Sequence, residues 1–249
     1  MAQINEIQAI MRELRLGATA EAVSQLIQTA NNEKATYGDF ILKVLKYEQR
    51  ERSEKVRLRR LNWASLPYQR SLEEFDLTSQ AALNQKQMNE LRALNWVDQS
   101  YNLILLGPTG VGKTFLSIGL CIDAIDQGYS AIFMTMGDLI KILKTETISR
   151  QAQIKLRRLN KADLIVIDDL MFMALTKQEA NLFFHFINKL YEQTSFIITS
   201  NKNPEKWGEV IGDEIITGAF LDRMIQKSQI IELTGESYRL THRQTIFKS

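Results

Sequence analysis

The sequence predicts an α/β domain with a five-stranded parallel sheet and helices on both faces, preceded by a small all-helical domain. From residue 102 onwards, short apolar runs that suit buried strands alternate with helical patterns. The first sixty residues instead show helical periodicity. A stretch around Leu66 and Pro67 separates the two regions, so we expect domains at 1–65 and 66–249.

Three helices are expected in the N-terminal domain. Gly17 fits the residue that stops the first helix, the second helix follows Thr19, and the third begins near Asp39. The first helix is predicted from apolar residues at helical spacing, namely Ile4, Ile7, Met11 and Leu14.

The second domain is expected to begin with a helix at about 83–98 that leads into the first strand. Thr176 and Glu179 form a capping-box pattern, which predicts the start of a helix over 177–191. The other helices are expected to begin near residues 113, 138 and 213. The five strands are predicted at 102–106, 130–135, 163–168, 195–200 and 228–233.

A glycine-rich segment, GPTGVGKT, joins the first strand to the next helix and has every fixed position of the pattern G-x-x-x-x-G-K-[ST]. Its glycines let the main chain curl, so that N–H groups at the helix N-terminus point at one spot and bind a polyphosphate. Lys113 can reach the β- and γ-phosphates, and the Thr114 hydroxyl can ligate Mg²⁺. The predicted nucleotide-binding residues are Gly107, Pro108, Thr109, Gly110, Val111, Gly112, Lys113, Thr114 and Phe115.

Two carboxylates follow the third strand, in the sequence LIVIDD. Because the carboxyl ends of parallel strands share one edge of the sheet, both lie at the ligand side. We assign Asp168 to the Mg²⁺ shell and Asp169 to polarising the attacking water.

Asn201 and Arg223 are the remaining candidates for catalysis. Asn201 ends the fourth strand at the same edge, where its amide could hold the attacking water, although an Asn at this position is also a common turn residue. Arg223 is the one arginine in an otherwise apolar stretch. It is either an arginine finger that acts on a neighbouring subunit, or a surface residue paired with Asp222 or Asp213.

The bulk composition excludes several classes of protein. A net charge of +2 is too small to indicate a nucleic-acid binder by itself. Cys121 is the only cysteine, which excludes an internal disulfide and a cysteine-rich zinc site. Its apolar surroundings predict a buried thiol and fit a reducing cytoplasm. We find neither a secretory signal nor an apolar run of about eighteen residues, so we expect a cytoplasmic protein without a membrane partner.

Positive charge gathers in two helical regions. Between Lys43 and Arg60 there are eight Lys or Arg residues and three Glu residues. Pairs such as Glu51 with Lys55 would explain part of this charge. For Arg57 to Arg60 no acidic residue is close enough in sequence to pair, which favours contacts with phosphates. The second cluster comprises Lys141, Lys144, Arg150, Lys155, Arg157, Arg158 and Lys161.

The motifs GPTGVGKT, LIVIDD, SFIITSN and FLDRM, in this order and spacing, resemble an AAA+ ATPase. The chain is most similar to the IstB/DnaC-like branch, and within it to the IstB-like helpers of transposition. The similarity covers nearly the whole chain and includes Leu72–Asp76 before the core and Gly235–Arg239 near the end. The sequence alone gives no physical role for the second of these segments.

The resemblance implies that ATP and Mg²⁺ bind at the P-loop, that Asn201 is a sensor-1 residue and that Arg223 is the arginine finger. It also implies an ATP-dependent homo-oligomer that grips duplex DNA and delivers it to a partner transposase. About sixteen residues follow the fifth strand, too few for a helical lid domain that would supply a sensor-2 arginine. Arg239 and Arg243 could take its place.

Three alternatives stay open from the sequence. A helicase loader of the DnaC type would share the ATPase core and prefer single-stranded DNA. A small-molecule P-loop kinase would need a mobile lid with an arginine, and the Asp168–Asp169 pair argues against it. An ATP-binding adaptor with negligible turnover would use Asp169 and Arg223 as switch residues.

Overall fold

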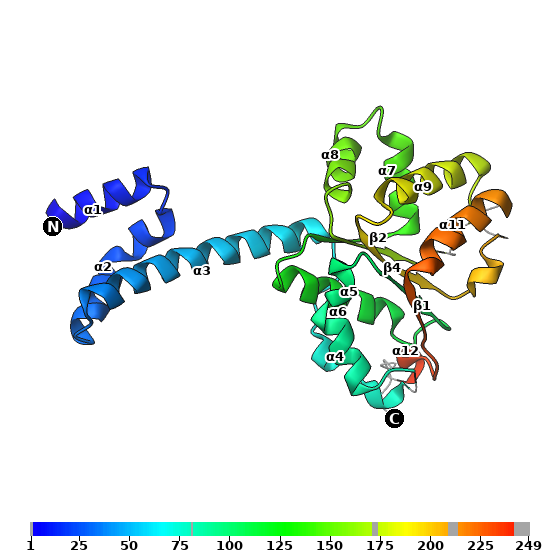
Figure 1. Ribbon diagram of the computed structural model, residues 1–249, viewed down its shortest axis with the longest axis horizontal. Coiled ribbons are helices and arrows are strands. Elements are labelled where there is room, and N and C mark those ends of the chain that lie inside the picture. The colour runs from blue at the N-terminus through cyan, green and yellow to red at the C-terminus, as the bar shows by residue number, and fades with distance from the viewer. Residues whose placement is uncertain (1, 81, 171–173, 209–213, 242–249) are drawn as a thin grey trace, which may run out of the picture. The chain divides into compact units, whose positions relative to one another are not determined.

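The computed structural model describes residues 2–80, 82–170, 174–208 and 214–241 (Figure 1). The chain forms two compact units, which divide between Arg59 and Arg60 inside the long helix α3 (Tyr37–Ala64). The first unit contains three helices, and the second contains the sheet and the helices that cover it.

In the first unit, α1 (Ala2–Glu13) packs on α2 (Gly17–Asn32), and α2 is joined to α3 through a buried carboxylate. Glu48 of α3 accepts hydrogen bonds from the backbone N–H and the hydroxyl of Thr19, both at 2.8 Å. Arg52 Nε pairs with the same carboxylate at 2.8 Å. These bonds lower the pKa of Glu48, although burial opposes them.

The prediction that Gly17 stops the first helix is wrong, because the helix ends two residues earlier. Arg15 takes the left-handed backbone conformation, with φ at 61°. The Leu16 N–H donates to the Met11 carbonyl, and the Arg15 N–H donates to the Arg12 carbonyl. This pattern closes a helix at its C-terminus, so Gly17 is left to begin α2.

The second unit has a five-stranded sheet in the order β2-β3-β4-β1-β5, with every neighbouring pair parallel. The predicted parallel sheet is therefore confirmed. β1, β3 and β4 are buried along their whole length, as their unbroken apolar runs indicate. The strands are β1 (Asn102–Leu106), β2 (Ala131–Thr135), β3 (Leu164–Asp168), β4 (Ser195–Ser200) and β5 (Ser228–Glu232).

Helices cover both faces of this sheet, and each face has its own apolar core. Alternate residues of β3 point to opposite cores: Leu164 and Val166 to one, Ile165 and Ile167 to the other. The first face is covered by α4 (Gln85–Ala93), α5 (Asn95–Asp98) and α6 (Lys113–Asp126). The second face is covered by α7 (Met136–Thr145), α8 (Arg150–Leu159), α9 (Lys177–Leu190) and α11 (Glu214–Gln226).

Short elements complete the second unit. The helix predicted at 83–98 is divided, because Leu94 takes a left-handed conformation between α4 and α5. The capping box of Thr176 and Glu179 is confirmed. The turns before the core are η1 (Leu72–Glu74) and η2 (Leu77–Ser79), η3 (Pro204–Lys206) follows β4, and α12 (Tyr238–Thr241) follows β5.

α12 is the only helix or strand after β5 in the part of the chain that the structure describes. Within the same residues, every helix is too short or too polar to cross a membrane.

Candidate nucleotide-binding site

The P-loop, residues 107–114, connects β1 to α6 by a turn that only glycine can make easily. Gly107, Gly110 and Gly112 have φ angles of 135°, 91° and 99°, in the left-handed region that disfavours other residues. A Cβ atom at Gly107 would lie 2.1 Å from the Leu233 carbonyl oxygen. The glycines are therefore required both by the backbone conformation and by the close approach of the chain after β5.

Lys113 begins α6, and its side chain turns back into the curve of the loop. Its Nζ donates to the carbonyl oxygens of Gly107 and Pro108, both at 2.8 Å, and the residue is 6% exposed. The ammonium group thus lies at the helix N-terminus, where backbone N–H groups also favour an anion. This placement fits a polyphosphate.

Thr114 and Asp168, which are 54 residues apart in sequence, meet at the carboxyl edge of the sheet. The Thr114 hydroxyl lies 3.0 and 3.1 Å from the two carboxylate oxygens of Asp168. A hydroxyl and a carboxylate are the oxygen ligands that Mg²⁺ takes when phosphates and water complete its shell. Among the described residues, no group of three or more His, Cys, Asp or Glu side chains could hold a metal. The Thr114 hydroxyl and the Asp168 carboxylate fit a metal whose other ligands come from phosphates and water.

Opposing effects act on the pKa of Asp168. Burial and the neighbouring charge of Asp169 raise its pKa, while hydrogen bonds from Thr199 and Thr114 and the charge of Lys113 lower it. Burial is the largest effect, so the pKa lies above its ordinary value. A divalent cation at this site would favour the ionised carboxylate.

Thr199 is a site residue that we did not predict from the sequence. Its hydroxyl donates to Asp168 Oδ1 at 2.6 Å and accepts from the Asp169 N–H at 2.9 Å. Its carbonyl oxygen accepts from the Leu170 N–H at 3.0 Å. A signal was available: Ile167 pairs with Ile198, so a parallel pairing of the two apolar runs places Thr199 beside Asp168.

Asp169 has the geometry of a residue turned out of its strand. Its φ is 53°, and its side chain is exposed while Asp168 is buried. Asn201 lies two residues beyond Thr199 and is also exposed. Both therefore stand at the carboxyl edge of neighbouring strands, and their roles toward a water molecule stay predictions.

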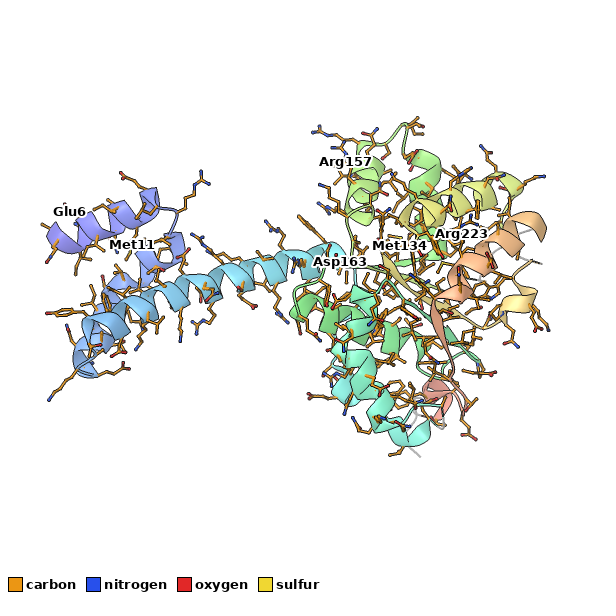
Figure 2. All side chains as sticks on the ribbon, in the orientation of Figure 1. Glu6, Met11, Met134, Arg157, Asp163 and Arg223 are labelled. Atoms are coloured by element: carbon orange, nitrogen blue, oxygen red, sulfur yellow. The ribbon has the colours of Figure 1, made fainter. Side chains whose placement is uncertain are left out.

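Arg223 lies on α11, whose core residues belong to the opposite face of the sheet from α6 (Figure 2). Its Nη1 donates to the Ala219 carbonyl of its own helix at 3.0 Å. Its guanidinium carbon lies 5.3 Å from the centre of the Phe184 ring of α9. Asp213, one of the two suggested partners, lies outside the described residues. The described contacts of Arg223 are thus to α9 and α11, away from the P-loop.

The segment after β5 packs directly on the P-loop. The Tyr238 N–H donates to the Gly110 carbonyl at 3.0 Å. A Cβ atom at Gly110 would lie 2.1 Å from Ser237 Oγ. The motif Gly235–Arg239 therefore has a physical role that the sequence left open, which is to cover the phosphate-binding loop. The side chain of Arg239 and the whole of Arg243 lie outside the described residues.

The ring of Phe115, a predicted nucleotide-binding residue, lies in an aromatic cluster with Tyr68 and Phe75, which precede α4 in the chain. The rings of Phe115 and Phe75 are stacked, with their centroids 6.0 Å apart and their planes at 29°. The centroid of the Tyr68 ring lies 6.4 Å from that of Phe115. A Cβ atom at Gly112 would lie 2.9 Å from the Phe75 ring. The segment before α4 therefore packs on the P-loop at Gly112, through the ring of Phe75.

The statement that Arg57 to Arg60 have no acidic neighbour to pair with is wrong for Arg57. Its guanidinium lies 3.3 Å from Glu54, because three residues along a helix bring two side chains together. Arg60 donates to the Gly128 carbonyl. The basic end of α3 is therefore partly engaged within the protein.

The second basic cluster, between Lys141 and Lys161, has several side chains exposed to solvent. Arg150, Lys155 and Arg157 of α8 are exposed, and the sequence has no acidic residue between 150 and 161. Arg157 projects from α8 in Figure 2. The guanidinium of Arg158 lies 4.4 Å from the Trp63 ring centre, which anchors the helix. The exposed face of α8 is therefore strongly cationic.

Comparison with known proteins identifies relatives over almost the whole chain. The profile of the IstB-like ATP binding protein family matches residues 9–246. An insertion sequence IS21-like ATP-binding protein of Bacteroides fragilis is 39% identical over 244 residues, which is 98% of this chain and 93% of the relative. The insertion sequence IS21 ATP-binding protein of Pseudomonas aeruginosa is 34% identical over 97% of this chain and 91% of its own length.

Solved structures agree on the fold. AMPPCP-bound DnaA from Aquifex aeolicus has a TM-score of 0.54 at 20% identity, over 68% of this chain and 51% of that one. The DnaC helicase loader has a TM-score of 0.51 at 20% identity, over 71% of this chain and 99% of that one. These similarities confirm the expected fold of the second unit, a parallel sheet with helices on both faces.

Proposed function

This chain belongs to the IstB-like ATP-binding protein family, and on that premise we propose that it is an ATP-hydrolysing AAA+ helper of an insertion-sequence transposase. The observation that carries the proposal is the contact of Thr114 with Asp168, held in place by Thr199. It brings the P-loop and the acidic strand end into one site for a nucleotide and its metal.

Hydrolysis transfers the γ-phosphoryl group of ATP to water. Lys113 binds the phosphates at the N-terminus of α6, and Thr114 and Asp168 would hold Mg²⁺, which would neutralise phosphate charge. Asp169 accepts a proton as the water oxygen bonds to the γ-phosphorus, while the bond to the bridging oxygen breaks and ADP leaves. Asn201 orients the water through its side-chain amide.

Arg223 completes this site from a second copy of the chain. Val111 of the P-loop belongs to the core on the α6 side of the sheet, whereas α11 packs in the opposite core, and this separation supports a role for Arg223 at the γ-phosphate of a neighbour. The ATP site is then shared between subunits, and ATP binding drives oligomer formation. This supports the proposed ATP-dependent homo-oligomer.

Duplex DNA is the proposed nucleic-acid partner, and the exposed face of α8 supports this. Arg150, Lys155 and Arg157 are exposed on a helix whose own sequence has no acidic residue, which favours phosphate contacts. We therefore expect binding that is independent of sequence and falls steeply with salt. Replacing Lys155 and Arg157 by Gln should weaken it and flatten that slope. Replacing the exposed Lys86 and Lys206 in the same way is the matched control.

The family's link to insertion sequences supports a cognate transposase as the protein partner, which receives the DNA held by the oligomer. The helical N-terminal domain, residues 1–65, is proposed to share in binding DNA or this partner. Its exposed cations include Lys55 and Arg59.

The test is sedimentation of the full chain with ATP and Mg²⁺ on duplex and on single-stranded DNA. Large ATP-dependent assemblies on duplex DNA are expected. Assembly only on single strands would instead indicate a helicase loader, and a monomer indifferent to both would revive a small-molecule kinase. Asp169→Asn should bind ATP and assemble but not hydrolyse it. Normal hydrolysis by this variant would contradict the assignment of the base.

A further inference from the structure

A cavity opens in the first unit between α2 and α3. Its volume is about 390 Å³, and α2, which lies beside the N-terminal half of α3, contributes the buried Leu26 to its lining (Figure 1). Leu42 and Tyr47 of α3 also line it. The other lining residues are charged and belong to α3, namely Asp39, Lys43, Lys46 and Arg50. Asp39 already accepts a hydrogen bond from the Thr36 hydroxyl at 2.6 Å. The cavity therefore combines apolar side chains with three cations and one carboxylate.

Large apolar side chains of α3 are exposed beside this cavity. Leu42 is 51% exposed, and Ile41 and Leu45 are 58% and 52% exposed, whereas Val44 and Glu48 of the same helix are buried. Because residues three and four apart are neighbours on a helix, Ile41, Leu42 and Leu45 form one surface, which we call the α3 apolar patch. Single apolar residues are ordinary on a protein surface, but three adjacent ones beside a cavity indicate a surface that binds a partner.

The cations of the cavity are available to a partner. Lys46 forms no ion pair with any residue that the structure describes. Lys43 lies 2.9 Å from Glu33, and Arg50 lies 3.3 Å from Glu51. Both of these pairs are open to solvent, where an ion pair contributes little free energy. Carboxylates of a partner can therefore replace these acids and pair with Lys46.

Three kinds of partner can be compared by their chemistry. Duplex DNA offers phosphates to the cations, but it would cover the α3 apolar patch with polar groups. A second copy that used the same surface would bring its own cations against these three, because a symmetric dimer pairs a surface with itself. An amphipathic helix with acidic residues beside its apolar face matches both the patch and the charge.

We propose that the cavity and the α3 apolar patch dock an acidic amphipathic helix of the partner transposase. This inference rests on the proposed function as a transposase helper. Apolar side chains of the docked helix enter the cavity against Leu26 and Leu42, and its apolar face covers Ile41 and Leu45. Its carboxylates pair with Lys46 and the neighbouring cations. Docking of this kind uses none of the residues proposed for ATP hydrolysis.

The apolar contact is tested by Leu42→Ser combined with Leu45→Ser, which changes no charge. Binding of the labelled cognate transposase to the full chain is measured by fluorescence anisotropy. The double variant should bind about tenfold more weakly than wild type, and its ATP turnover without transposase and its assembly on duplex DNA should stay unchanged. Ile10→Ser combined with Leu14→Ser is the matched control on exposed residues of α1, and it should keep the wild-type affinity.

The charge is tested by an exchange of sign. Overlapping peptides of the transposase identify the segment that binds, and its affinity should fall as salt is raised. Lys46→Glu should weaken binding of this peptide. A peptide with Lys in place of its acidic residues should bind Lys46→Glu more tightly than it binds wild type. Arg12→Glu, the same change at an exposed residue of α1, is the control and should not produce this reversal.

Each outcome decides the proposal. A Leu42→Ser, Leu45→Ser variant that melts like wild type and binds transposase as tightly would overturn the docking site and leave the ATPase proposal standing. Loss of assembly on DNA together with loss of transposase binding would assign the patch to DNA or to contacts between copies, and would overturn it too. If the double variant fails to fold, the sign exchange at Lys46 decides. A wild-type chain that binds no transposase would overturn both this inference and the proposed helper function.

Discussion

The carboxyl edge of the sheet and the surface of α11 were both predicted to serve one reaction, yet they are built differently. At the sheet edge, the hydroxyls of Thr114 and Thr199 both lie within 2.6 to 3.1 Å of the Asp168 carboxylate. On α11, Arg223 is bonded to its own helix and faces Phe184. The first region joins residues of three elements in one chain, whereas the second presents a single guanidinium whose described contacts are to α11 and α9.

The difference indicates which steps one chain can perform. Binding of phosphates and metal needs only the sheet edge and the P-loop, so a monomer should bind ATP. In our proposal, stabilising the transition state needs an additional cation, and Arg223 of α11 supplies it to another copy. An arrangement of this kind makes hydrolysis depend on assembly, and it can be tested by impairing each region separately.

The largest effect is expected for Arg223→Ala, which should lower ATP turnover about 10³-fold and leave ATP affinity unchanged. Lys113→Ala should abolish ATP binding. Each variant alone should hydrolyse ATP far more slowly than wild type, but a mixture of the two should regain activity, because one supplies an intact P-loop and the other an intact Arg223. Turnover against mixing ratio measures this. Lys227→Ala, a change just after the same helix, is the control, and a mixture that stays inactive would place Arg223 outside the shared site.

A smaller loss, roughly tenfold to a hundredfold in turnover, is expected for Thr199→Val. The change removes the hydroxyl that orients Asp168 and holds the Asp169 N–H, while it keeps the shape of the side chain. Thr199→Ser keeps the hydroxyl and should restore most of the activity. Turnover at varied Mg²⁺ concentration is the measurement, since a misplaced Asp168 should also raise the Mg²⁺ required. A requirement that stays at the wild-type value would show that Thr199 is only a packing residue.

A third change separates the P-loop from the segment that covers it. Gly110→Ala should destabilise the protein by about 1–3 kcal/mol, because its φ of 91° strains any side chain and its Cβ would meet Ser237 Oγ. Ser237→Gly should recover the part due to the steric clash and leave the part due to backbone strain. Urea denaturation of the two single variants and the double variant gives this coupling. If the losses of stability in the two single variants simply add in the double variant, Ser237 does not limit the space for a side chain at position 110.

The sheet edge could be predicted from the sequence because its parts are local. A P-loop fixes its own backbone, and an apolar run followed by two carboxylates fixes a strand end, so Lys113, Thr114 and Asp168 followed directly. Thr199 was missed because its role depends on which strands are neighbours and on their register. The contact of Ser237 with Gly110 joins segments more than a hundred residues apart and has no local pattern. The sequence identified Arg223 as a candidate, but it could not show which face of the sheet α11 covers.

The smallest effect concerns the helix layer that carries Arg223. α11 packs on α9, and α9 is joined to α7 where Glu179 accepts from Lys144 Nζ at 2.8 Å. That bond, together with bonds from Thr176, lowers the pKa of Glu179 from 4.5 to about 2. Because the pKa is lowered on folding, the stabilisation is complete above pH 4.5 and is lost as the pH falls toward 2.

Glu179→Gln keeps one oxygen that can accept from Thr176, but it removes the charge and replaces the oxygen that accepts from Lys144 Nζ with an NH₂ group. It should lower the free energy of unfolding by about 1–2 kcal/mol at pH 7, a modest value because Lys144 is 55% exposed and solvent screens the pair. The difference from wild type should shrink between pH 4.5 and pH 2, as urea denaturation at several pH values can measure. Glu90→Gln, at an exposed pair, should have little effect throughout. A difference that stays constant down to pH 2 would mean that the carboxylate charge does not hold this layer, and that apolar packing of α9 alone positions α11 and its arginine.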